Sequence, residues 1–119
     1  GAVETLIGSV DKGGRVGVVV PGLRTDGWPT HLADHWQESF WTFKSAAWWE
    51  ALFAEAPGLR VDEVVTVDWG LSDDWIAWAD TCDDWARSLG REPYELEAAM
   101  LRADIDRSLV FVMMTATKV

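Results

Sequence analysis

The sequence predicts an α/β fold, because stretches with helical spacing of apolar residues alternate with β-branched runs. A continuous β-branched run at residues 15–20 is followed by a helical stripe at 46–56 and by a second β-branched run at 60–68. The last residues, 108–119, are again rich in Val, Met and Thr. With 119 residues and no internal repeat or linker, the chain is predicted to form a single structural unit over residues 1–119.

The N-terminal elements are predicted to be the end of a helix and a buried strand. Val3, Leu6 and Val10 recur at helical spacing until the turn DKGG stops the helix. The run at 15–20 lacks polar alternation, which is typical of a strand covered on both faces in a parallel sheet. The segment that follows, 21–44, is much longer than the ~2–6 residues that usually connect such elements, so we expect it to have a function.

The second half of the chain is predicted to contain three helices and two strands. Ser45 is a favourable N-cap for the helix at 46–56, and Ser72, followed by two aspartates, caps the next helix. Pro93 begins a third helix at about 93–103. The first two helices carry apolar stripes, which are Trp48, Trp49, Leu52, Phe53 and Ala56 in one and Trp75, Trp78, Cys82, Trp85 and Leu89 in the other.

The predicted sheet is too small to stand alone. Sheets of about three strands are short of apolar area for a stable core. The strand at 15–20 is therefore expected to find neighbours in another part of the same protein or in a second copy of the chain. For the same reason the isolated chain is expected to associate with itself or with the missing half.

Charge and composition exclude several classes of partner. Twenty acidic and ten basic residues give a formal net charge of −10, and the basic residues are scattered, so neither nucleic acid nor a membrane surface is an expected partner. No run of about eighteen apolar residues and no signal peptide is present. The single cysteine, Cys82, is expected to be a buried free thiol, which indicates a reducing, cytoplasmic location.

Three stretches of the chain are similar to a known family. They read DKGGRVGVVVPGLR, HLADHWQESFWTFKSAAWWEALF and SLVFVMMTATK. Together they resemble the C-terminal half of class I S-adenosylmethionine-dependent methyltransferases, and most closely a bacterial group with a KPGG turn, an hGhVVPG strand and a Trp-rich segment. The resemblance covers nearly the whole chain, and the aromatic stretch is its more specific part.

The resemblance implies a Rossmann-like methyltransferase sheet of which this chain supplies the fifth to seventh strands, at 15–20, 60–68 and 108–119. The helices at 72–103 would be an insertion before the last strand, and the last two strands of the family form an antiparallel pair at the sheet edge. No Gly-rich loop joins a strand to a helix in this chain, so the cofactor-binding half is missing. The implied function is methyl transfer to a small-molecule acceptor, with S-adenosylmethionine bound mainly by that missing N-terminal half and this chain alone inactive.

The segment 21–44 starts at the carboxyl end of a strand, where α/β sheets bind ligands. The candidate acceptor-binding residues in it are Arg24, Trp28, His31, Trp36, Trp41 and Phe43, with Asp26 beside them. His35 is the candidate general base, because histidine titrates near neutral pH. The alternative is that Trp36, Phe40 and Trp41 simply pack the segment onto the sheet.

Two polar patterns have competing interpretations. His31 and His35 have the i, i+4 spacing that can bind a metal from one helical face, but no third ligand is evident and no metal is expected. The acid pairs at 73–74 and 83–84 fall at a predicted helix start and on a predicted helix exterior. Both pairs are therefore expected to interact with the helix dipole or with solvent, and not to act as paired catalytic acids.

The stripe that contains Trp75, Trp78 and Trp85 is too aromatic for an ordinary exposed helix face. It is expected to be core, a lid over the active site or a dimer face. The last option supports an alternative function, in which the chain is a non-enzymatic interaction module that dimerises through its Trp-rich helix faces and binds no cofactor.

Overall fold

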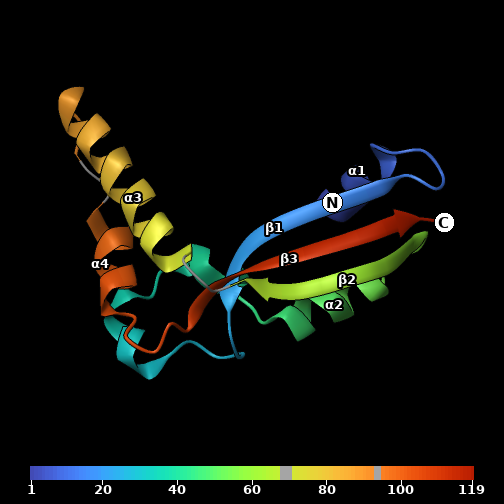
Figure 1. Ribbon diagram of the computed structural model, residues 1–119, viewed down its shortest axis with the longest axis horizontal. Coiled ribbons are helices and arrows are strands. Elements are labelled where there is room, and N and C mark those ends of the chain that lie inside the picture. Colours follow the sequence, from blue (N-terminus) through green and yellow to red (C-terminus); the bar gives the residue numbers. More distant parts are fainter. Residues whose placement is uncertain (68–70, 93–94) are drawn as a thin grey trace.

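The computed structural model describes residues 1–67, 71–92 and 95–119 (Figure 1). It combines a three-stranded sheet with helices, so the predicted α/β class is confirmed. Two of the helices project from one end of the sheet, away from the end that carries the C-terminus (Figure 1). The predicted strand end at residue 68, the capping side chain of Ser72 and the predicted helix start at Pro93 lie outside what the structure describes.

The sheet is antiparallel throughout its described strands. These are β1 (Arg15–Leu23), β2 (Leu59–Val67) and β3 (Leu109–Lys118), in the order β1-β3-β2. β3 is antiparallel to both neighbours, so β1 and β2 run in the same direction without pairing. The expectation of a parallel sheet is therefore wrong for the pairing of the strand at 15–20, whereas the last two strands, β2 and β3, form the antiparallel pair that the resemblance implies. The direction of a strand depends on the partner brought beside it, and β-branched composition alone does not reveal that partner.

Helices cover one face of the sheet. α1 (Ala2–Gly8) and α2 (Ala46–Ala54) pack on that face, around a core of Val16, Phe53, Leu59, Val112, Met114 and Ala116. On the opposite face Val19 is 59% exposed, and it lines a shallow apolar hollow together with Val67, Phe111 and Met113. Within the described residues, the prediction that the strand at 15–20 is covered on both faces is therefore wrong.

The start of α2 is attached to the end of β1 by a small polar network. Ser45 Oγ accepts a hydrogen bond from Trp48 N at 3.2 Å, which confirms the predicted N-cap. Asp26 accepts from both the backbone N and the Oγ of Ser45, each at 2.8 Å. Gly22 allows the two segments to approach, because a Cβ at this position would lie 2.5 Å from Lys44 O.

Two helices, α3 (Leu71–Ser88) and α4 (Glu95–Ala103), lie between β2 and β3 in the chain and pack against each other. Arg102 Nη2 of α4 lies 2.6 Å from Asp80 Oδ2 of α3, which links the helices at their surface. No helix in the described ranges combines the length and the apolar character needed to span a membrane.

The buried row of α3 differs from the predicted stripe. Trp75, Ala79 and Asp83, each four residues apart, are buried, whereas Trp85 is 63% exposed and Cys82 is exposed. The predictions of a buried Cys82 and a solvated Asp83 are therefore wrong. Residues four apart form a ridge along a helix, and the small Ala79 in that ridge allows close packing.

Candidate functional site

The long segment predicted to carry the site lies at the end of the sheet where β1 stops and β3 begins (Figure 1). Leu23, the last residue of β1, pairs with Leu109, the first residue of β3. The segment forms two short 3-10 helices, η1 (Thr30–His35) and η2 (Glu38–Thr42). The structure distributes the predicted site residues among three settings: an aromatic cluster, an exposed rim and a polar turn.

Trp28, Phe40 and Phe43 form the aromatic cluster. The rings of Trp28 and Phe40 stack with centroids 5.6 Å apart, and those of Phe40 and Phe43 with centroids 4.8 Å apart. All three rings pack against a second apolar core, made of Leu23, Leu32, Trp75, Met100, Leu101 and Leu109. The cluster therefore anchors the segment to the sheet end. For Phe40 this is the packing alternative given under Sequence analysis, whereas Trp28 and Phe43 are candidates for acceptor binding there.

Trp36 and Trp41 form the exposed rim. Trp36 packs edge-on against Trp28 with centroids 5.1 Å apart and remains 47% exposed, and Trp41 is 62% exposed. Both line a hollow of about 200 Å³ beside the aromatic cluster. Small-molecule pockets usually have volumes of roughly 300 to 1,000 Å³, so this hollow could accommodate only part of an acceptor.

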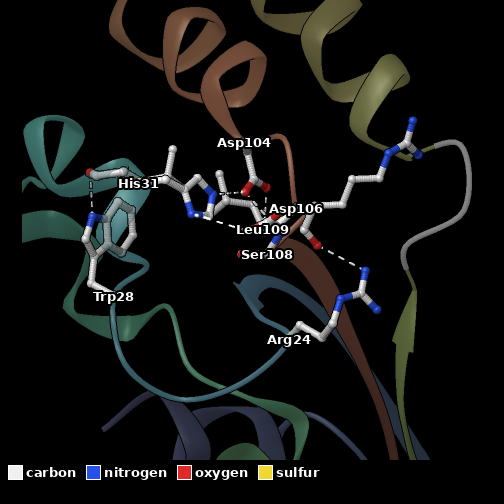
Figure 2. Close-up of polar contacts among 9 residues, drawn as sticks. Arg24, Trp28, His31, Asp104, Asp106, Ser108 and Leu109 are labelled. Atoms are coloured by element: carbon white, nitrogen blue, oxygen red, sulfur yellow. Dashed lines mark hydrogen bonds and ion pairs between the residues drawn. The ribbon is translucent and has the colours of Figure 1, made fainter.

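His31 belongs to the polar turn at residues 104–108, where it contacts a buried carboxylate (Figure 2). Its Nε2 lies 2.8 Å from Asp104 Oδ1, and the Asp104 side chain is only 3% exposed. Asp104 also accepts hydrogen bonds from Ser108 N at 3.0 Å and from Leu109 N at 2.8 Å. The carboxylate therefore orients the His31 ring and fixes the turn that leads into β3.

The other ring nitrogen of His31 lies toward Asp106, and both residues border a cavity. His31 Nδ1 lies 3.8 Å from Asp106 Oδ2, and both residues line a polar cavity of about 580 Å³. Thr25, Pro29 and Ser108 are also in its wall. A neutral His31 that donates its Nε2 proton to Asp104 retains a lone pair on Nδ1, and that nitrogen can accept a proton or a hydrogen bond from a molecule in the cavity.

Arg24 supports the same polar turn (Figure 2). Its Nη2 donates to Arg107 O at 3.0 Å, and its backbone N donates to Ser108 O at 2.9 Å. Arg107 has a φ of 51°, in the left-handed region that a non-glycine residue seldom adopts. Arg24 thus stabilises a strained turn. The sequence suggested Arg24 only as a candidate acceptor-binding residue and did not reveal this structural role.

His31 and His35 do not form a metal site. They lie in a 3-10 helix, in which residues three apart, and not four apart, are aligned on one face. No group of three or more His, Cys, Asp or Glu side chains within the described ranges is placed to hold a metal ion. The predicted i, i+4 pattern required an α-helix at this position.

A third cavity, which is apolar, lies where β1 and β3 meet α3 and α4. Its volume is about 430 Å³, which is within the usual range for a small-molecule pocket. It is lined by Pro21, Asp74, Trp75, Trp78, Glu97 and Phe111. The cavity was not predictable from the sequence, because its walls come from β1, α3, α4 and β3, which are far apart in the chain.

The end of β1 does not have the strand-to-helix loop on which an S-adenosylmethionine site is usually built. Such sites use a Gly-rich loop that joins a strand to the N-terminus of a helix. Here β1 leads into a bent segment, and the first helical residue after it is Thr30 of a short 3-10 helix. Comparison of the sequence with models of known protein families returned no match, and neither did comparison with curated proteins.

Proposed function

We propose that this chain is the acceptor-binding portion of a class I-like S-adenosylmethionine-dependent methyltransferase that methylates a small molecule. The observation that carries the proposal is the arrangement of the sheet, in which β2 and β3 form an antiparallel pair at one edge and the apolar β1 forms the other. The family that the sequence resembles ends its sheet with such an antiparallel pair. Proteins usually avoid an unprotected apolar edge strand, so a further strand beside β1 is expected.

In this proposal S-adenosylmethionine binds mainly to a half of the protein that lies outside these 119 residues. The cofactor, when bound, supplies the reactive methyl group. The contribution of this chain is to bind the acceptor, to orient it and to keep water away from it. The cavities beside Trp36, His31 and Trp78 all lie at the sheet end where β1 stops, which is the edge at which α/β sheets bind ligands.

His31 is the proposed group that accepts a proton from the acceptor. Its ring is oriented by Asp104, and the residue lines the polar cavity. His35, which the sequence suggested for this role, lies at the end of η1 and lines none of the three cavities at this end of the sheet. The geometry therefore favours His31 over His35.

Methyl transfer by the full-length product of the gene tests the proposal. With methyl-labelled S-adenosylmethionine and a panel of small-molecule acceptors, we expect labelled product from the full-length protein and none from residues 1–119 alone. His31→Ala should lower turnover about 100-fold, which is the low end of the usual effect of a general base. His35→Ala in parallel decides between the two histidines. Absence of transfer to every acceptor class would contradict the proposal.

A second candidate function is a non-enzymatic module that dimerises through its Trp-rich helix face. The exposure of Trp78, Trp85 and Leu89 on α3 favours it, because large apolar side chains on one helix face often mark an interface. A full-length protein that transfers no methyl group, but forms a dimer that Trp85→Ala dissociates, would support this candidate.

A further inference from the structure

The apolar cavity at α3 and α4 has walls made largely of aromatic rings. Trp75 is 8% exposed, and its ring centroid lies 4.7 Å from that of Phe111, so the inner wall is fixed by packing. Trp78, one turn further along α3, is 59% exposed and forms the outer wall. Aromatic rings attract organic cations through the negative charge of their faces, and this attraction is strongest for tryptophan.

The charged groups in the wall of this cavity are carboxylates. Asp74 of α3 and Glu97 of α4 both line it, and no Lys, Arg or His is among its described lining residues. Glu97 Oε1 accepts a hydrogen bond from Trp75 Nε1, which holds the carboxylate beside the aromatic wall. The wall is therefore complementary to a molecule that is apolar and positively charged.

We propose that this cavity binds an apolar organic cation, such as a protonated aryl-alkyl amine. The inference goes beyond the proposed function, because it assigns a second ligand site and not the acceptor site beside His31. The volume of about 430 Å³ is sufficient for a ligand with one aromatic ring. The site is distinct from the polar cavity at His31, which is lined by other residues.

Three probes that share a phenyl ring and differ in charge test the inference: 2-phenylethylammonium, 2-phenylethanol and 3-phenylpropanoate. Each is titrated into residues 1–119 and into the full-length protein, and binding is followed by tryptophan fluorescence and by the indole N–H signals in NMR spectra. The cation should bind at least about tenfold more tightly than the alcohol, which corresponds to the gain expected from a cation–π contact. The anion should bind more weakly than the alcohol.

Variants of the wall should affect the cation selectively. Trp78→Ala should weaken binding of the cation roughly tenfold. Asp74→Asn and Glu97→Gln should each weaken it roughly three- to tenfold and leave binding of the alcohol unchanged. The matched controls are Trp85→Ala and Asp84→Asn, which alter exposed residues of the same helix that do not line the cavity. Neither control should change the affinity of the cation.

Several results would overturn the inference. They are equal affinity for the three probes, no binding of the cation at about 10 mM, or an effect of Asp84→Asn as large as that of Asp74→Asn. Because the titration needs no cofactor, its outcome is separate from that of the methyl-transfer assay. A cation that binds to a full-length protein without transferase activity would refute only the proposed function.

Discussion

Replacing Asp104 by Ala is expected to lower the free energy of unfolding by about 3 kcal/mol. The carboxylate is buried and accepts hydrogen bonds from Ser108 N and Leu109 N, and it also contacts His31. Removing it leaves two backbone N–H groups without their acceptor, at a cost of roughly 1 to 3 kcal/mol each. Urea unfolding, followed by circular dichroism, measures the loss.

Asp106→Ala is the matched control for this prediction. Asp106 is two residues away, but its side chain is 75% exposed, so the free energy of unfolding should change by no more than about 0.5 kcal/mol. His31→Ala should fall between the two variants, because it removes one contact of Asp104 and leaves both backbone bonds. If Asp104→Ala and Asp106→Ala had equal effects, the buried polar turn would not be the anchor described here.

Phe53→Ala is expected to cost about 3 to 5 kcal/mol in the free energy of unfolding, the usual range for removing a buried aromatic ring. Phe53 is 4% exposed and packs with Val112 and Met114 in the core between α2 and the sheet. The variant is produced at low temperature, and the difference between its thermal midpoint and that of the native chain reports the loss.

Trp41→Ala, measured in the same assay, tests whether the burial of a ring or its size determines the loss of stability when the ring is removed. Trp41 has the larger ring but is 62% exposed, so its removal should change the free energy of unfolding by less than about 1 kcal/mol. If Trp41→Ala destabilised the chain as much as Phe53→Ala, the rim would be part of a core, and its assignment as an exposed wall of the small hollow would fail.

The sequence predicted the elements of this fold well, because each has a local signal. Helix α2 begins after the predicted cap Ser45, and β2 at Leu59–Val67 nearly matches the predicted 60–68. Strand direction was not predictable in the same way. The pairing of Val16 with Ala116 joins residues on strands far apart in the chain, and nothing near either residue specifies whether the strands are parallel or antiparallel.

The position of segment 21–44 in the fold was predictable, but the contacts that its residues make were only partly so. The length of segment 21–44 and its position after β1 correctly indicated the end of the sheet. Asp104 could not be found, because it lies 73 residues from His31 and follows a helix whose pattern indicates only packing. The sequence also did not predict which individual rings are buried. Trp75 and Trp78 belong to the same predicted stripe, but Trp75 is 8% exposed and Trp78 is 59% exposed.

Titration calorimetry with S-adenosylmethionine tests the proposal that this chain supplies the acceptor side of a methyltransferase and that another half of the protein binds the cofactor. Residues 1–119 alone should bind the cofactor no more tightly than about millimolar, because they contain no Gly-rich loop between a strand and a helix. The full-length product of the gene should bind it with a Kd of about micromolar. Micromolar binding by residues 1–119, or no binding by the full-length protein, would contradict the account.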